Sequence, residues 1–244
     1  MTADGNVLAL VARYPHLGAV KTRLAAAIGA AAAYTLYCAF LRDLAERLTA
    51  GPWQLHWLYT PSDDPFAAWL GPGHAVSPQC GASLNDRLLN GFRSLCQVFP
   101  RVIIMSSDSP HVPLEWIAEG FTLLASHDVV LGPCADGGYY LVGMRAPHDL
   151  FSGITMSTAT VLAETLALAH RRSLSTAQLP VTFDVDDVAG LAALSDWLDR
   201  RRTDVLPRTR ALLAGCPRHV TPGPHPLACL PVQLGPAVPI DPGQ

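Results

Sequence analysis

The chain has 244 residues, of which 50% are hydrophobic and 15% are charged, and its formal net charge is −3. These values exclude a disordered chain and a disulfide-stapled mini-protein, and they give no basic surface for a nucleic-acid backbone. No apolar run reaches the roughly 20 residues of a membrane span, and the first residues lack the basic start of a signal peptide. The six cysteines are scattered without C-x-x-C spacing, which indicates reduced thiols. We therefore expect a cytoplasmic protein with no membrane partner and no nucleic-acid partner.

Short apolar runs alternate with helical stretches along most of the chain. The expected strands are 6–13, 53–60, 101–105, 128–132, 139–144 and 177–185, and the expected helices are 23–48, 83–98, 114–126, 158–171 and 188–201. This alternation predicts βαβ crossovers and a three-layer α/β/α fold around a mostly parallel sheet. The last 30 residues hold 8 prolines and 4 glycines. We therefore predict one domain over residues 1–214 and a Pro- and Gly-rich tail over residues 215–244.

A loop with cationic residues follows the first expected strand. Ligands of open α/β sheets bind at the carboxyl ends of the strands, where helix N-termini present free N–H groups. The residues in this loop suited to phosphate oxygens are Arg13, Gly18, Lys21, Thr22 and Arg23, and Lys21 is the only lysine of the chain. The segment is not a Walker sequence, so a solvated surface loop is the alternative.

Carboxylates follow two other expected strands. Asp108 lies in a turn after the strand 101–105, and Asp184 and Asp186 point to the same side of an extended segment. Three carboxylates packed without a cation would repel one another, which favours a metal site on Asp108, Asp186 and Asp184 for Mg²⁺ or Mn²⁺. The alternative is that Asp108 caps a turn or the next helix. Asp187 is the expected cap of the helix that begins at Val188, as Ser83 is of the helix 83–98.

The turn between the strands 128–132 and 139–144 carries Asp136, Gly137 and Gly138, followed by Tyr139 and Tyr140. Its glycines let backbone N–H groups approach a ligand, and tyrosines can pack on a sugar or a base. Asp-Gly and Gly-Gly are also hairpin signals, and both interpretations can hold. The sequence has no G-x-S-x-G motif and no G-x-G-x-x-G after the first strand, which argues against a hydrolase triad and a Rossmann site.

Taken in order, these segments resemble the bacterial DUF2064 family, a branch of the GT-A glycosyltransferase and nucleotidyltransferase superfamily. The family is associated with arsenosugar and selenium gene sets. The matching pieces are Lys21-Thr-Arg-Leu24, Gln79-Cys-Gly81 with Leu84 and Arg87, Ser107-Asp-Ser-Pro110, the segment 132–143, Ser157-Thr158 and Phe183-Asp-Val-Asp186.

The resemblance implies a GT-A-like fold in which the first loop cradles a nucleotide. It places Gln79 and Gly81 near the base, adds Arg87 and Ser107 to the nucleotide site, and puts the metal on Asp108 and on Asp186 or Asp184. For the small-molecule acceptor it implies a second group of residues, namely Gly137, Gly138, Tyr139, Ser157 and Thr158. The chain departs from the family pattern at Ala135, Asn85 and Met156, where the family has Glu, Gly and Trp. The missing glutamate implies an altered substrate or reduced activity.

Our first hypothesis is a metal-dependent nucleotidyltransferase that joins an NTP to a phosphorylated small molecule and releases pyrophosphate. Lys21 and Arg23 would stabilise the β- and γ-phosphates, and Mg²⁺ on Asp108 and Asp186 would align the α-phosphate. The alternative is a glycosyltransferase that uses a nucleotide-diphosphate sugar, with Asp136 as a base or acceptor-orienting group. A third reading, motivated by Ala135, is a nucleotide-binding protein without activity.

Overall fold

The computed structural model describes residues 5–201 and 205–214, so the predicted tail over 215–244 lies outside the described residues. The strands are β1 (Asn6–Arg13), β2 (Gln54–Thr60), β3 (Ala75–Pro78), β4 (Arg101–Ser106), β5 (Val129–Pro133), β6 (Tyr139–Met144) and β7 (Thr176–Gln178). The helices are α1 (Thr22–Ile28), α2 (Ala30–Leu48), α3 (Phe66–Leu70), α4 (Leu84–Leu95), α5 (Leu114–Leu123), α6 (Val161–Arg171), α7 (Val188–Asp199) and α8 (Pro207–Ala214).

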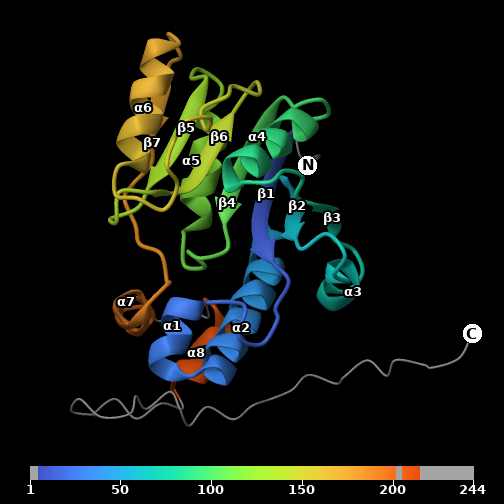
Figure 1. Cartoon of the computed structure of the whole chain (residues 1–244), viewed down its shortest axis with the longest axis vertical. Helices are drawn as coiled ribbons and strands as arrows, with labels where there is room; N and C mark the ends of the chain where they lie inside the picture. Colours follow the sequence, from blue (N-terminus) through green and yellow to red (C-terminus); the bar gives the residue numbers. More distant parts are fainter. Residues whose placement is uncertain (1–4, 202–204, 215–244) are drawn as a thin grey trace, which may run out of the picture.

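The strands form one sheet in the order β3-β2-β1-β4-β6-β5-β7 (Figure 1). Strand β6 runs antiparallel to both of its neighbours, β4 and β5, and every other pair in the sheet is parallel. The prediction of a mostly parallel sheet is confirmed. The carboxyl ends of β1, β2 and β4 consequently meet at one edge of the sheet, where ligands of such folds bind.

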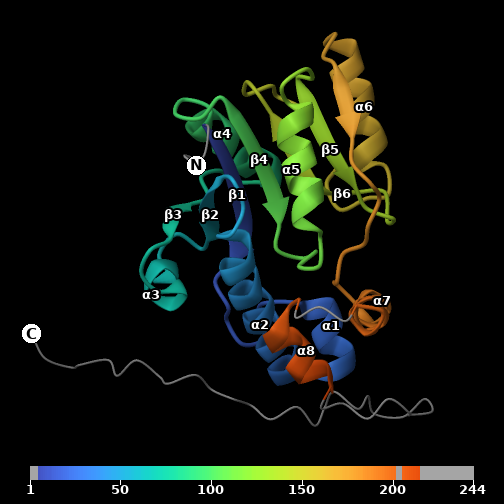
Figure 2. The ribbon, with the colours of Figure 1, turned by 180° about the vertical axis from the view of Figure 1, so that it is seen from behind.

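Alternate side chains of the central strands enter two separate cores. Leu8 and Leu10 of β1 pack into the core that α2, α3 and α5 cover, whereas Val7 and Ala9 pack into the core under α4 and α6. Figures 1 and 2 show these helices on the two opposite faces of the sheet. The arrangement confirms the predicted three-layer α/β/α fold.

A third core lies beyond the sheet edge, between α1, α2, α7 and α8 (Figure 2). The buried carboxylate of Asp43 on α2 accepts hydrogen bonds from the backbone N–H groups of Arg208 and Thr209, and so caps the start of α8. The sequence analysis did not predict α8, because its cap comes from a residue more than 160 positions earlier.

Two expected elements are wrong in extent. The helix expected over 23–48 is two helices, because Gly29 adopts φ 88° and ψ 149° between α1 and α2. The strand expected over 177–185 ends at Gln178, because Pro180 has no N–H for a ladder. Beyond it, the Leu179 N–H still donates to the Leu131 carbonyl oxygen, and Thr182 forms an isolated bridge with Cys134. The expected caps are confirmed: Ser83 forms a capping box with Asp86, and Asp187 caps α7.

Among the described residues, no helix is both long enough and apolar enough to cross a membrane.

Candidate functional site

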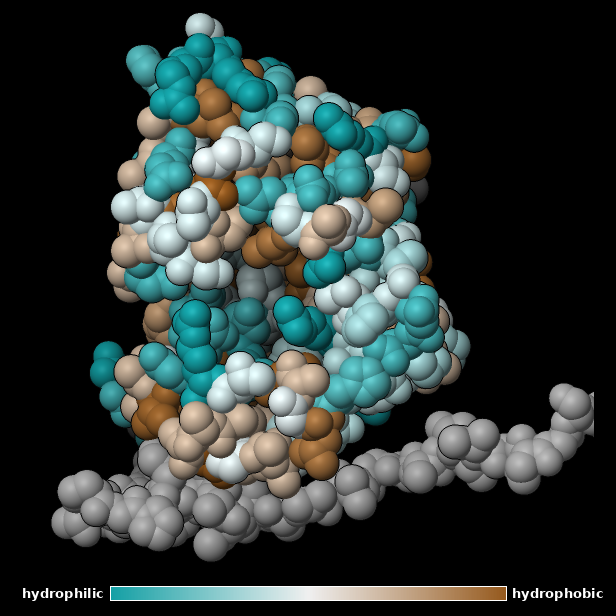
Figure 3. Space-filling view, viewed as in Figure 1, coloured by the Kyte–Doolittle hydropathy of each residue, from teal (hydrophilic) through white to brown (hydrophobic). Residues whose placement is uncertain are grey.

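A pocket of about 740 Å³ opens at the carboxyl ends of β1 and β4, beside the start of β6. Figure 3 shows the face of the molecule hollowed between the sheet and the helical group of α1, α2, α7 and α8. Most of the predicted site residues line this pocket: Arg13, Lys21, Thr22, Arg23, Gln79, Arg87, Ser107, Asp108, Asp136, Gly138, Tyr139, Ser157, Thr158, Asp184 and Asp186. The structure therefore brings residues from six separate sequence segments into one cavity.

The remaining predicted residues, Gly18, Gly81 and Gly137, do not line the pocket, but two of them shape it. A Cβ on Gly81 would lie 2.5 Å from the Cβ of Asp86, so the glycine lets the chain pass close to the start of α4. A Cβ on Gly137 would lie 2.0 Å from the carbonyl oxygen of Ala159, and Gly137 also has φ 89°. Glycine at 137 therefore holds the loop before α6 against the β5–β6 turn.

Lys21 occupies the space between two of the predicted metal ligands. Its Nζ donates hydrogen bonds to Asp108 Oδ1, to Asp186 Oδ1 at 2.9 Å and to the carbonyl oxygen of Val185 at 2.8 Å. An ammonium group has three N–H donors, so these acceptors use all of them. The Lys21 side chain is 3% exposed, whereas Asp108 and Asp186 are 35% and 44% exposed. We call Asp108 and Asp186 the carboxylate pair.

The ion pairs hold Lys21 in an unusual state. Burial lowers the pKa of Lys21, but the attraction of Asp108 and Asp186 outweighs it and raises the pKa above its ordinary value. The backbone of Lys21 is left-handed, with φ 48° and ψ 45°, immediately before α1. That conformation costs a residue with a Cβ about 1–2 kcal/mol. The contacts of the ammonium offset this cost.

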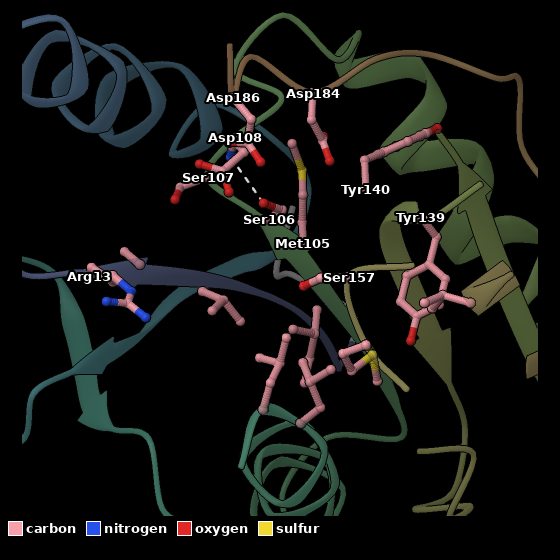
Figure 4. A pocket seen from close by; sticks show the side chains of 18 of the residues that line it. Arg13, Met105, Ser106, Ser107, Asp108, Tyr139, Tyr140, Ser157, Asp184 and Asp186 are labelled. Carbon is pink, nitrogen blue, oxygen red and sulfur yellow. Dashed lines mark hydrogen bonds between the residues drawn. The ribbon is translucent and has the colours of Figure 1, made fainter. Parts of the chain in front are cut away.

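Asp184 lies beside the carboxylate pair but has other partners (Figure 4). Its Oδ1 accepts a short hydrogen bond from the Ser109 hydroxyl, and the Cys134 thiol is a second partner. Burial, together with the carboxylates of Asp108 and Asp186, raises the pKa of Asp184 to about 6. Asp184 does not share the Lys21 ammonium, so its place in a three-carboxylate metal site stays a prediction.

The carboxylate pair is a donor set suited to Mg²⁺ or Mn²⁺. Both side chains place an oxygen at one common point, which Lys21 Nζ occupies, and such ions in phosphoryl-transfer sites take one or two carboxylates together with substrate oxygens and water. Within residues 5–201 and 205–214, no three His, Cys, Asp or Glu side chains form a metal-binding group. The pair therefore fits an ion that also takes ligands from a substrate, on the condition that the ammonium leaves.

Three guanidinium groups line the same pocket, those of Arg13, Arg23 and Arg87, which we call the arginine set. In the part of the chain that the structure describes, none of them forms an ion pair with a carboxylate. Arg87 Nε donates to the carbonyl oxygen of Gly81 at 3.0 Å, which fixes the side chain. The Tyr37 hydroxyl bonds to both the N–H and the carbonyl oxygen of Arg13. The pocket thus holds three guanidinium groups without an acidic partner among the described residues, and the side chain of Arg87 is fixed by a hydrogen bond.

Gln79 has a fixed orientation in the pocket. Its side-chain nitrogen donates to the carbonyl oxygens of Leu58 at 2.9 Å and Ala12 at 3.3 Å, at the ends of β2 and β1. Because both amide hydrogens are used, only the Gln79 carbonyl oxygen is left for a ligand, as a hydrogen-bond acceptor.

The β5–β6 turn confirms the hairpin interpretation. Asp136 Oδ1 accepts the backbone N–H of Gly138 at 2.9 Å, and β6 returns antiparallel to β5. Tyr139 and Tyr140 both line the pocket, but Tyr140 is only 1% exposed and its ring packs where a Cβ of Gly132 would lie. Successive side chains of a strand point to opposite faces, so the two rings face different surroundings, and packing of either ring on a ligand stays a prediction.

Comparison with known proteins identifies the family. The family model described as "Uncharacterized protein conserved in bacteria (DUF2064)" matches residues 43–158. The crystal structure of a provisionally assigned nucleotide-diphospho-sugar transferase from Desulfovibrio desulfuricans G20 is 33% identical, with a TM-score of 0.79, and the match covers 88% of this chain and 96% of that one. The chain belongs to the DUF2064 family. No curated protein matches it.

More distant structures share the fold of this DUF2064 protein. A cytidylyltransferase from Leptospira borgpetersenii is 12% identical with a TM-score of 0.56, and the match covers 86% of this chain and 94% of that one. The 4-diphosphocytidyl-2C-methyl-D-erythritol synthase of Anaerococcus prevotii is 8% identical with a TM-score of 0.52, covering 81% and 98%. At these identities the likeness concerns the fold alone. Together with the Desulfovibrio structure, it confirms the GT-A-like architecture.

The residues at which the chain departs from the DUF2064 pattern have clear positions. Asn85 Nδ2 donates to the carbonyl oxygens of Phe151 at 2.6 Å and Ile154 at 2.8 Å, so it ties α4 to the loop that leads into the pocket. Met156 lines the pocket at the end of that loop. Ala135 is exposed in the β5–β6 turn, where it contributes no polar side chain.

Three residues that support the site were not predicted from the sequence. Tyr37 fixes the end of β1, and Ser109 and Cys134 surround Asp184. Ser109 follows Asp108 in the same turn, so its position offered a signal. Tyr37 and Cys134 offered none, because each contacts the site from another element of the fold.

Proposed function

We propose that this DUF2064 protein is a transferase for phosphate-bearing nucleotides, and that its reaction joins an NTP to a phosphorylated small molecule with release of pyrophosphate. The observation that carries the proposal is the combination of the arginine set and the carboxylate pair in one pocket. A triphosphate needs several cations, and guanidinium groups bind phosphate oxygens in a bidentate manner. The provisional assignment of the Desulfovibrio relative supports the same class of enzyme.

In the proposed reaction, a phosphate oxygen of the acceptor attacks the α-phosphorus of the NTP. The bond from the α-phosphorus to the bridging oxygen of the β-phosphate breaks, and pyrophosphate leaves with the electron pair. Arg13, Arg23 and Arg87 hold the phosphate oxygens and stabilise the charge that develops on the leaving group. An ionised phosphate needs no strong general base. A divalent ion bound by Asp108 and Asp186 would neutralise charge at the α-phosphate when present.

Base and acceptor recognition follow from the other walls of the pocket. The acceptor oxygen of Gln79 suits a base that presents an N–H donor. The β5–β6 turn with Asp136, Gly138 and Tyr139, together with Ser157 and Thr158, forms the acceptor side. The main-chain N–H groups of such a turn and the exposed hydroxyls are donors for acceptor oxygens.

A glycosyltransferase reaction is the second candidate, and one observation favours it. The pocket-lining residues from the β5–β6 turn and from the segment 156–161 include no lysine and no arginine. This half of the pocket fits a neutral, hydroxylated group such as a sugar, with Asp136 as the base or orienting group.

A thermal-shift screen tests the proposal. The protein is mixed with Mg²⁺ or Mn²⁺ and each of the common NTPs, and in parallel with UDP-, GDP- and ADP-sugars; a ligand at 100 times its Kd adds about 2.7 kcal/mol of stability. The expected result is the largest metal-dependent shift with an NTP, followed by pyrophosphate release when phosphorylated acceptors are added. A shift with nucleotide sugars alone selects the glycosyltransferase. Nucleotide binding without turnover over a broad acceptor set would indicate an inactive binding protein.

A further inference from the structure

The only lysine of the chain is buried inside the site, between the two carboxylates proposed to hold a divalent ion. Resting on the proposed function, we infer that Lys21 is a resident cation: it occupies the carboxylate pair in the free protein, competes there with free divalent metal, and is displaced most readily when a metal–nucleotide complex binds. The affinity of the site for free metal is thereby low in the absence of its nucleotide.

The contacts make the ammonium and a metal ion mutually exclusive. Asp108 Oδ1 and Asp186 Oδ1 both contact Lys21 Nζ, so these oxygens are directed at one point. An ion bound to the same oxygens would lie against the ammonium, and two cations at that distance repel strongly in a partly buried site. One of them must therefore leave.

The exposure of the three groups indicates from which side the exchange takes place. The carboxylates of Asp108 and Asp186 are 35% and 44% exposed, whereas Lys21 is 3% exposed and is bonded on its inner side to the Val185 carbonyl oxygen. An incoming ion therefore reaches the carboxylates from the pocket, with the ammonium behind them. Figure 4 shows Asp108 and Asp186 side by side at this wall of the pocket.

The backbone around Lys21 favours its release. The backbone of Lys21 is left-handed while its ammonium contacts the carboxylate pair, and movement of the ammonium would allow the backbone to relax. Two positions later in the same loop, Arg23 lines the pocket and is exposed. Phosphates bound by Arg23 and by the rest of the arginine set would bring their metal ion to the open side of the carboxylate pair.

The deciding experiment measures Mn²⁺ binding to the full chain without nucleotide, by electron paramagnetic resonance of the free ion. Wild-type protein is expected to bind Mn²⁺ weakly. Lys21→Met keeps an unbranched side chain one atom shorter than lysine and removes the charge, so it should bind Mn²⁺ at least about tenfold more tightly. Lys21→Arg keeps the charge and should stay weak. The double variant Lys21→Met/Asp108→Asn should lose the gain.

Equal Mn²⁺ affinity of wild type and Lys21→Met would overturn the inference. The melting temperature supplies a second readout on the same samples, because an unneutralised carboxylate pair is repulsive: Mn²⁺ should raise the melting temperature of Lys21→Met more than that of wild type. An equal rise in both proteins would contradict the inference as well.

A further test uses the wild-type protein, so it does not depend on whether a variant folds. Because Lys21 is the only lysine, acylation of its ε-amine is followed at one peptide by mass spectrometry and compared with the rate in the urea-unfolded chain. Protection is expected without ligand, with a rise of about tenfold or more as the metal–NTP complex, or Mn²⁺ at high concentration, fills the carboxylate pair. Continued protection under all of these conditions overturns the inference. If no NTP binds but Lys21→Met still binds Mn²⁺ more tightly than wild type, the proposed function is refuted and the role of Lys21 as a resident cation stands.

Discussion

Two kinds of cation line the pocket of this DUF2064 protein, and they differ in what surrounds them. Lys21 is buried and bonded to three protein acceptors, whereas Arg13, Arg23 and Arg87 are exposed or half-buried and pair with no carboxylate among the described residues. A satisfied cation belongs to the architecture of the resting site. An unpaired one is available to a ligand. The comparison teaches that a residue's chemical type, which the sequence shows, does not reveal its availability, which depends on its neighbours.

The largest expected effect comes from removing the charge of Asp108, a partner of the buried Lys21 ammonium. Asp108→Asn keeps the shape of the side chain but removes a charge that both Lys21 and a metal would use, so turnover should fall by about 10²–10³-fold. Stability should fall by about 1–3 kcal/mol, which is less than for a fully buried pair because Asp108 is 35% exposed. Turnover assays and urea unfolding measure the two effects. Asp63→Asn, an exposed change away from the pocket, is the matched control. Full activity of Asp108→Asn would refute the role of the carboxylate pair.

The unpaired cations should act on ligand binding and not on folding. Arg87→Ala should weaken NTP binding by about 10–100-fold, because a hydrogen bond to a charged group contributes about 1.5–3 kcal/mol. The loss for the nucleoside monophosphate should be smaller, and the melting temperature should stay close to that of wild type. Calorimetric titration measures both affinities.

Arg93→Ala is the control for this effect, since Arg93 is exposed on the same helix and does not line the pocket. Equal losses for the triphosphate and the monophosphate would show that Arg87 does not contact the distal phosphates. Equal losses in Arg87→Ala and Arg93→Ala would reduce the arginine set to a general electrostatic effect.

His111 extends the comparison to a buried group that stays uncharged. It is 1% exposed and stacks on Phe183 at 4.0 Å between ring centroids, and its Nε2 lies 2.8 Å from Thr182 Oγ1. Burial, with the positive charges of Arg47 and Arg201, lowers the pKa of His111 to about 3. Below pH 6.5 the unfolded chain takes up a proton that the folded protein refuses until about pH 3. Stability therefore falls as the pH falls through this window.

By pH 4, protonation of His111 in the unfolded chain should lower the free energy of unfolding by about 3 kcal/mol relative to pH 7. Urea unfolding of wild type and His111→Gln at pH 7, 5.5 and 4 measures it. Asp184 acts in the opposite direction, because its raised pKa makes the folded state take up a proton before the unfolded chain does. Asp184 is common to both proteins, so the difference between their pH profiles isolates His111. Parallel pH profiles of the two proteins would contradict the prediction.

The sequence predicted which residues gather but not how they pair. Apolar runs, strand ends and the Ser83 capping box are local patterns, and they placed most candidate side chains in one pocket. The contacts of Lys21 join positions 87 and 165 residues apart, so only the tertiary fold determines that its partners are Asp108 and Asp186. The break at Gly29 is a local feature, and it was not predicted because the residues around it favour a continuous helix. Alanines on both sides favour helix, and only the positive φ of the glycine reveals the boundary.

The smallest expected effect concerns Asn85, a position at which the family resemblance implies glycine. Its amide donates two hydrogen bonds to the loop that carries Met156 and Ser157, so Asn85→Ala should lower the free energy of unfolding by about 1–2 kcal/mol. Asn90 lies on the same helix as Asn85 and donates one exposed hydrogen bond to the carbonyl oxygen of Cys80. Asn90→Ala should therefore lower the free energy of unfolding by less. Thermal unfolding compares the two variants. If Asn85→Ala lowers the free energy of unfolding no more than Asn90→Ala does, the loop is held in place by its packing. The availability of Ser157 to the acceptor then does not depend on this departure from the family pattern.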